Sequence, residues 1–210
     1  MHDGSLVLAQ PRHSDRLLLL FHGVGSSARD LAPLGSALAQ ARPAATVVSV
    51  EAPLPSQLGQ GQEWLSVGGI TEGNRPQRIA GAMPSFLQAI RHWQDRCGLG
   101  PQQTVLLGFS QGAIMALEST QLDAGESGAA HRVMALAGRF AGPVRRAPSD
   151  LRLNLIHGEQ DDVVWPKWSA QAAAEWSGLG GDVTLDLVPG LGHGIDARAL
   201  QLALKHLPPG

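Results

Sequence analysis

The sequence predicts an α/β fold in which helices cover both faces of a mostly parallel β-sheet. Short runs rich in leucine and β-branched residues alternate along the chain with stretches that have apolar residues at helical spacing. The run at 17–21 is apolar at every position, as expected for a strand that is covered on both faces. No internal repeat and no linker-like change of composition divides the chain. We therefore expect residues 1–210 to form one domain without a large cap domain.

The expected elements follow from these two kinds of pattern. Strands are expected at residues 17–21, 46–50, 104–108, 132–136, 151–156 and 183–188. Helices are expected at residues 30–42, 76–97, 112–119, 166–176 and 196–206. The longest helix has apolar side chains at three- to four-residue spacing, and Gly98 is expected to end it.

Charge and composition exclude several classes of protein. The chain has 16 Lys and Arg against 18 Asp and Glu, so it lacks the basic excess that nucleic acids and anionic membranes attract. Its longest apolar run is far shorter than the ~20 residues that span a bilayer. The first ten residues do not resemble a signal peptide, and the single cysteine, Cys97, cannot form an internal disulfide. We therefore expect a cytoplasmic protein.

Residues 51–75 do not follow the alternation of strands and helices. This segment contains five glycines, has two prolines near its start and shows no sustained period. A loop of this length in a compact domain is usually functional. Its apolar side chains, Trp64 and Leu65 among them, are candidates for lining a substrate pocket. The alternative, in which these side chains anchor the loop to the body of the protein, stays open.

Polar residues follow four of the expected strands. In open α/β sheets, ligands bind outside the carboxyl ends of the strands. The segments at those positions are 22–25, 109–111, 158–162 and 190–193. A serine, an acid and a histidine therefore lie in three different loops at one edge of the sheet.

The serine belongs to Gly108-Phe-Ser110-Gln-Gly112, a G-x-S-x-G sequence between a buried strand and a helix. This context identifies a nucleophile elbow, in which small residues allow the sharp turn that presents the serine hydroxyl. A chance match in a glycine-rich chain is the alternative, and the flanking strand and helix disfavour it. Ser110 is therefore the candidate nucleophile.

A serine nucleophile needs a base and a carboxylate that orients the base. His193 lies in a glycine-rich loop after the last expected strand and is the candidate base. His157 is expected to shape the turn that follows its strand, and His206 to lie in the last helix as a surface or packing residue. Fixed N–H donors must also stabilise the oxyanion of acyl transfer. The candidates are the backbone N–H groups of Gln111 and of Val24, in the early His22-Gly-Val-Gly25 loop.

Four segments together resemble the phospholipase/carboxylesterase family of α/β-hydrolases, which includes small serine esterases and acyl-protein thioesterases. They are Phe21-His-Gly-Val-Gly25, Gly108-Phe-Ser-Gln-Gly-Ala113, His157-Gly-Glu-Gln-Asp161 and Gly192-His193. The resemblance extends over residues 17–207 and looks closest to the bacterial esterase branch. It implies an α/β-hydrolase fold, a triad of Ser110, Asp161 and His193, no metal and no organic cofactor.

The spacing from His157 in the resembling family selects Asp161 over its neighbour Asp162. We expect Asp162 to cap the turn or the helix near Pro166 instead. Thioesterase members often carry Ser-Gly after the strand that follows the nucleophile helix. This chain has Ala137-Gly138-Arg139 there, and Arg139 is expected to narrow or charge one side of the cleft.

The leading hypothesis is a carboxylesterase that cleaves short- to medium-chain esters through an acyl-enzyme on Ser110. A thioesterase or lysophospholipase with the same triad is the alternative. A non-catalytic ligand binder of the same fold is disfavoured because all three triad residues are present. Peptidase and dienelactone hydrolase activities are less favoured. The expected partner is a small-molecule ester or thioester, and a homodimer is left open.

Overall fold

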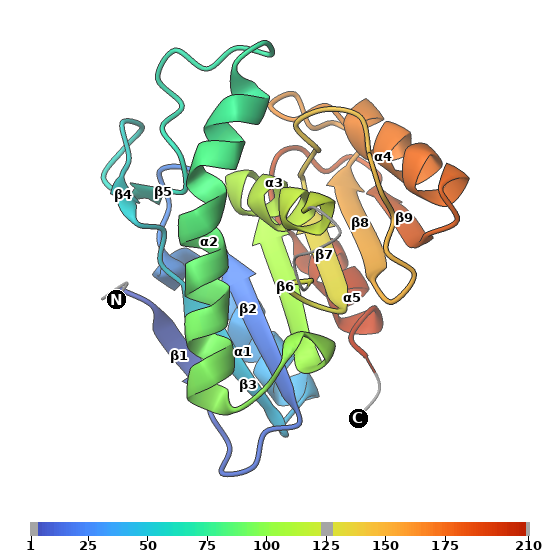
Figure 1. The fold of residues 1–210 in the computed structure, drawn as a ribbon. Helices are drawn as coiled ribbons and strands as arrows, with labels where there is room; N and C mark the ends of the chain where they lie inside the picture. Colours follow the sequence, from blue (N-terminus) through green and yellow to red (C-terminus); the bar gives the residue numbers. More distant parts are fainter. Residues whose placement is uncertain (1–3, 123–127, 209–210) are drawn as a thin grey trace.

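The computed structural model describes residues 4–122 and 128–208. Seven of its strands form one sheet in the order β1-β3-β2-β6-β7-β8-β9 (Figure 1). The strands are β1 (Leu6–Ala9), β2 (Arg16–Phe21), β3 (Ala45–Val50), β6 (Thr104–Phe109), β7 (Arg132–Leu136), β8 (Arg152–Gly158) and β9 (Asp182–Val188). All neighbouring pairs are parallel except β1 with β3. The predicted fold class is confirmed.

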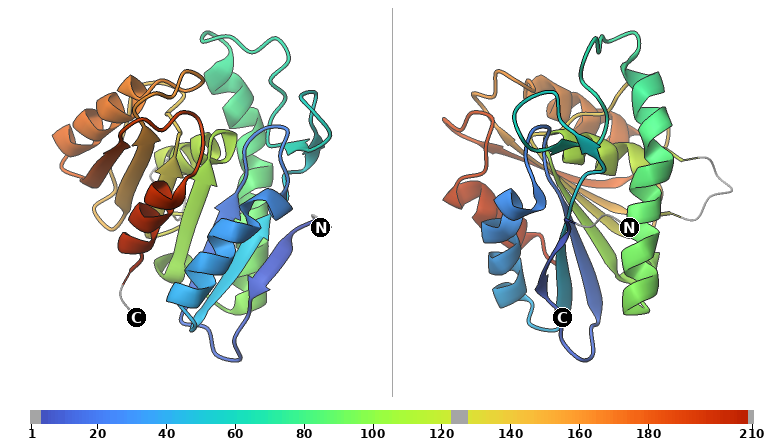
Figure 2. Two further views of the ribbon diagram at one scale, coloured as in Figure 1. Left: turned by 180° about the vertical axis from the view of Figure 1, so that it is seen from behind. Right: turned by 90° about the vertical axis from the view of Figure 1, so that its left-hand side faces the viewer.

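In the described part of the chain, five α-helices cover the two faces of this sheet (Figure 2). They are α1 (Ala32–Ala41), α2 (Arg75–Cys97), α3 (Gln111–Glu118), α4 (Lys167–Gly178) and α5 (Ala197–Lys205). Side chains of α2, α3 and α4 pack in one hydrophobic cluster, and those of α1 and α5 pack in a second cluster on the opposite face. The expected helices are all present, and their ends differ from the expected ones by at most two residues.

The central strand β2 shows why the apolar runs specify this arrangement. Leu17, Leu19 and Phe21 belong to the cluster under α2 and α3, whereas Leu18 and Leu20 belong to the cluster under α1 and α5. Successive side chains of a strand point to opposite faces, so a strand between two helical layers must be apolar throughout.

The sequence analysis did not predict strand β1 or a second, two-stranded sheet. The edge strand β1 has only four residues, and its pairing with β3 contains an irregularity. Within residues 51–75, Leu54–Pro55 (β4) and Gln62–Glu63 (β5) form a two-stranded sheet. The segment predicted as irregular is therefore partly ordered by backbone pairing.

The expectation of one domain extends to residues 1–3, 123–127 and 209–210, which lie outside the described part of the chain. Within the part that is described, no helix is both long and apolar enough to cross a membrane.

Candidate active site

Ser110 lies at a strained turn between β6 and α3. Its backbone has φ 52° and ψ −116°, outside the regions that non-glycine residues ordinarily occupy. The turn is held in place by the Ser110 N–H, which donates to Leu136 O at 3.0 Å. A Cβ atom at Gly112 would lie 2.1 Å from Phe21 O, and one at Gly108 would lie 2.4 Å from the backbone of Ala113. Both glycines of the motif are therefore required by close backbone approach.

The three candidate triad residues meet at the carboxyl edge of the sheet. His193 Nε2 lies 2.9 Å from Ser110 Oγ, and His193 Nδ1 lies 2.7 Å from Asp161 Oδ2. Because Nδ1 faces a carboxylate, it carries the hydrogen, and Nε2 is then free to accept the serine proton. The His193 side chain is 18% exposed, whereas that of Asp161 is fully buried. This is the arrangement of a nucleophile, a base and an orienting acid.

Asp161 is hydrogen-bonded through both oxygens. Its Oδ1 accepts from the N–H groups of Val163 and Val164 at 2.9 and 2.8 Å, and its Oδ2 accepts from His193. Burial alone raises the pKa of Asp161, but these hydrogen bonds outweigh burial and hold the pKa below its ordinary value. Asp161 is therefore ionised at neutral pH.

The expected capping role of Asp162 is corrected by this geometry. Asp161 itself holds the turn through Val163 and Val164, and Asp162 is exposed. Helix α4 begins after Pro166 without a side-chain cap. One carboxylate thus both closes the turn and faces the imidazole.

The buried side chain of His22 supports the loop that follows β2. The ring is fully buried, with Nδ1 2.8 Å from Gly23 O and Nε2 accepting from the Ala52 N–H at 3.1 Å. Burial lowers the pKa of His22, against smaller opposing effects of the Gly23 hydrogen bond and nearby carboxylates. The neutral ring fits these partners, because Nδ1–H donates while Nε2 accepts. His22 therefore fixes the backbone that leads to Val24.

The same loop is paired with residues 51–75. The Gly25 N–H donates to Gln62 O at 3.0 Å, and the Gln62 N–H donates to Ser26 O at 2.7 Å. The tip of the segment reaches this loop as well, because a Cβ at Gly25 would lie 2.2 Å from Leu58 O. Residues 51–75 therefore support the loop that carries the Val24 N–H.

Gln111 joins the elbow to the same segment. Its backbone N–H is the first of α3 and has no partner within that helix. Its side chain is 5% exposed, accepts from the Trp64 N–H at 2.7 Å and donates to Leu65 O at 2.8 Å. The sequence analysis considered only the backbone of Gln111. Its burial beside a segment 46 to 47 positions away could not be read from the motif.

Trp64 and Leu65 lie in the hydrophobic core, at 2% and 5% exposure. The Trp64 indole donates to His22 O at 3.0 Å and packs edge-on against Phe21 and Phe86. This placement favours anchoring over an open pocket wall. Leu54 and Leu58 of the same segment are 43% and 56% exposed.

Arg139 is held at the rim of the same edge. It follows β7, and its guanidinium lies 4.2 Å from the Trp168 ring and donates to both carboxylate oxygens of Glu72 at 3.2 and 2.7 Å. The hydrogen bond from Arg139 lowers the pKa of Glu72. Arg139 and Trp168 border a cavity of about 220 Å³. Arg139 was expected to narrow or charge one side of the cleft. Its positive charge is paired with the carboxylate of Glu72.

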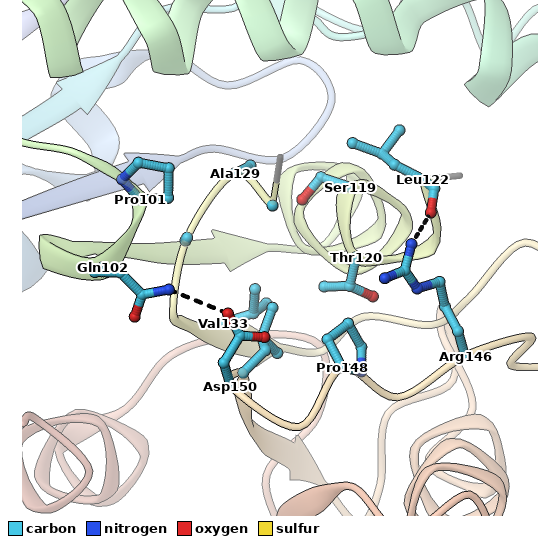
Figure 3. A pocket seen from close by; sticks show the side chains of 13 residues that line it. Pro101, Gln102, Ser119, Thr120, Leu122, Ala129, Val133, Arg146, Pro148 and Asp150 are labelled. Atoms are coloured by element: carbon cyan, nitrogen blue, oxygen red, sulfur yellow. Dashed lines mark hydrogen bonds between the residues drawn. The ribbon is translucent and has the colours of Figure 1, made fainter. Parts of the chain in front are cut away.

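A different cavity, of about 370 Å³, lies at the amino ends of β6, β7 and β8, the opposite edge of the sheet (Figure 3). Its Ser119 and Thr120 hydroxyls donate to helix carbonyls at 2.7 Å, and Gln102 donates to Asp150 across it at 3.1 Å. Its lining, as far as the chain is described, includes no histidine that could serve as a base. No cluster of three or more metal-ligating side chains occurs among residues 4–122 and 128–208.

Comparison with known proteins agrees with this geometry. The model of the phospholipase/carboxylesterase family of α/β-hydrolases matches residues 2–208. The chain belongs to this family. The resemblance carried by the elbow, the early glycine-rich loop and the acid and histidine loops is thereby confirmed.

Members of this family and solved structures match nearly the whole chain. Esterase YpfH of Escherichia coli (strain K12) is 44% identical over 206 residues, covering 98% of this chain and 88% of the relative. The crystal structure of esterase PE8 is 30% identical with a TM-score of 0.84, covering 96% of this chain and 94% of that one. The Bacillus cereus carboxylesterase, at 16% identity and a TM-score of 0.78, covers 96% and 91% and shares the fold.

Proposed function

We propose that this protein is a carboxylesterase that hydrolyses small carboxylic esters through an acyl-enzyme on Ser110. The observation that carries the proposal is the continuous hydrogen-bonded line from Ser110 Oγ through His193 to Asp161. The family and the esterases similar to the chain support the ester-cleaving reaction. Ser110 is the nucleophile, His193 the general base and Asp161 the orienting acid.

Acylation begins when Ser110 Oγ attacks the ester carbonyl carbon and its proton passes to His193 Nε2. The carbonyl oxygen becomes an oxyanion, which the N–H groups of Val24 and Gln111 stabilise. His193 returns the proton to the leaving alkoxide as the C–O bond breaks, so an alcohol departs and the acyl group stays on Ser110.

Deacylation repeats these steps with water. His193 takes a proton from water as the water oxygen attacks the acyl carbon. The proton then returns to Ser110 Oγ, and the carboxylic acid leaves. Asp161, buried and ionised, keeps Nδ1 protonated throughout and stabilises the imidazolium that forms in each half of the reaction. Every proton in this cycle is carried by groups of the chain or by water.

The direct test is labelling with a fluorophosphonate probe, followed by mass spectrometric mapping of the modified peptide. Ser110 is expected to be labelled in the folded protein, and Ser110→Ala to lose hydrolysis of p-nitrophenyl butyrate with an unchanged melting temperature. Residual turnover of Ser110→Ala above about a thousandth of wild type would show that another residue is the nucleophile. A fatty acyl thioester assayed alongside separates a thioesterase from a simple esterase.

A further inference from the structure

Asp161 faces a second imidazole besides that of His193. His157 Nε2 lies 3.2 Å from Asp161 Oδ2, the same oxygen that accepts from His193 Nδ1 at 2.7 Å. The side chains of His157 and Asp161 are both fully buried. The turn after β8 brings them together, because the Asp161 N–H donates to Gly158 O at 3.2 Å. The carboxylate oxygen that orients the base therefore has two imidazole neighbours.

The surroundings of His157 determine where its hydrogen lies. Nε2 is also 2.7 Å from Val164 O, and both of its partners can only accept, so Nε2 carries the hydrogen. Nδ1 lies 2.7 Å from the buried hydroxyl of Ser169 on α4, which can donate to it. Burial lowers the pKa of His157, and the titratable groups that act on the ring are Asp161 and His193. The ring is therefore neutral, donating through Nε2 and accepting through Nδ1.

We propose that His157 is a positioning residue of the catalytic acid and that Ser169 holds it in place. This inference rests on the proposed function, since it assigns His157 a role in orienting Asp161. Backbone N–H groups hold Oδ1, so His157 is the group besides the base that contacts Oδ2. Its contact with Val164 O also fixes the turn that supplies one of those N–H groups.

The hydrogen bond from His157 also affects how strongly the Asp161 carboxylate attracts His193. Two N–H groups donate to Oδ2, so each of these hydrogen bonds is weaker than the bond from a single donor would be. Without His157, the carboxylate would attract the protonated form of His193 more strongly. The carboxylate would also be less firmly oriented. The two effects predict a lower rate together with an upward shift of the acidic limb of the pH profile.

The test compares His157→Leu, which removes the donor, with His157→Gln, which keeps an N–H group near the Nε2 position. The readouts are kcat/KM for p-nitrophenyl butyrate as a function of pH, and the melting temperature. His157→Leu is expected to lose about tenfold to a hundredfold in kcat/KM, with its acidic limb at higher pH. His157→Gln is expected to recover most of the rate and the wild-type position of the limb.

Ser169→Ala provides a milder variant, because it leaves the ring in place and removes only its support. Its control is Ser177→Ala, an exposed serine on the same helix. Ser169→Ala should shift the limb in the same direction as His157→Leu, and Ser177→Ala should not. If His157→Leu does not fold, the Ser169 and Ser177 pair decides the question.

Two results would overturn the inference. One is a folded His157→Leu with the wild-type rate and pH profile. The other is a loss of rate that His157→Gln shares in full while the limb stays in place, which indicates a structural role. If wild-type protein neither hydrolyses esters nor labels at Ser110, the proposed function itself fails, so the two failures are distinguishable.

Discussion

Gln111 Oε1 accepts a hydrogen bond of 2.7 Å from the backbone N–H of Trp64. The residue that follows the nucleophile is thus bound to a segment that precedes it by 46 to 47 positions, and Nε2 of the same side chain donates to Leu65 O. Trp64 in turn reaches His22 O through its indole. Hydrogen bonds therefore connect the segments that carry both proposed oxyanion donors to residues 51–75.

Replacing Gln111 by alanine is expected to lower kcat/KM by about tenfold to a hundredfold, although its backbone N–H remains. The reason is that both hydrogen bonds to the segment are lost, so the loop that carries Val24 is less firmly placed. Gln94→Ala is a matched control. Gln94 is also buried and donates two hydrogen bonds of 2.9 Å, to Thr104 and Ala129, but it lies on α2 away from the triad.

Each of the two variants is expected to lose about 1–3 kcal/mol of stability, because each removes two hydrogen bonds and leaves their partner groups unpaired. Steady-state kinetics and urea unfolding separate the two effects. Equal losses of activity in Gln111→Ala and Gln94→Ala would mean that the Gln111 side chain affects catalysis only through general stability.

The adjacent acids Asp161 and Asp162 are expected to differ by orders of magnitude. Asp161→Asn places an amide opposite His193 Nδ1 and favours the wrong tautomer, which typically costs on the order of 10⁴ in kcat. Asp162 is exposed, so Asp162→Asn is expected to keep near wild-type turnover. The measurement is kcat for a p-nitrophenyl ester. An inactive Asp162→Asn beside an active Asp161→Asn would contradict the assignment.

Short to medium acyl chains are expected to give the highest kcat/KM. The described residues contain no large cap domain over the carboxyl edge of the sheet that could enclose a long acyl chain. The apolar side chains Trp64 and Leu65 are committed to the core and are not free to line a long acyl channel. The experiment measures kcat/KM for acetyl, butyryl, octanoyl and palmitoyl esters, and a maximum at palmitoyl would refute this expectation.

The sequence was sufficient to identify the residues that meet at the sheet edge. Ser110, Asp161 and His193 each follow a strand whose apolar pattern is strong, and parallel strands bring their carboxyl ends to one edge. A Cβ atom at Gly108 or Gly112 would lie only 2.4 or 2.1 Å from neighbouring backbone atoms, so the turn requires glycine at both positions and the motif is legible in the sequence. Local chemistry and periodicity thus determine this part of the site.

The supporting contacts could not be read in the same way. Trp64 lies in a segment without periodicity, so no pattern shows whether its side chain faces the core or a cleft. The hydrogen bonds of the Gln111 side chain and the pairing of Glu72 with Arg139 join residues 46 to 67 positions apart. The contact between His157 and Asp161 is only four residues apart, but it depends on a turn whose shape the sequence does not reveal. Side-chain partners of this kind depend on tertiary packing.

The last prediction concerns acid stability. His22 and His157 are buried and neutral, and burial lowers the pKa of each. In the unfolded chain a histidine titrates near pH 6.5, so below that pH the unfolded state binds more protons than the folded state. The free energy of unfolding must therefore fall as the pH drops from about 6.5 towards the lower folded-state values, by at most about 1.4 kcal/mol per pH unit for each residue.

This acid-induced loss begins at a higher pH than the loss caused by carboxylates such as Asp161. The pKa of Asp161 is also lowered on folding, so its contribution is complete above the ordinary value near 4 and is lost only below that pH. Urea unfolding between about pH 7 and pH 5 therefore includes the effect of these two histidines. His131, whose pKa is also lowered by burial, acts in the same direction, and Glu118, whose pKa is raised by burial, acts in the opposite direction. His157→Gln should reduce the slope of stability against pH, whereas His92→Gln, at an exposed position on α2, should leave it unchanged. A His157→Gln variant that keeps the full wild-type slope would show that the His157 ring is not held neutral by the fold.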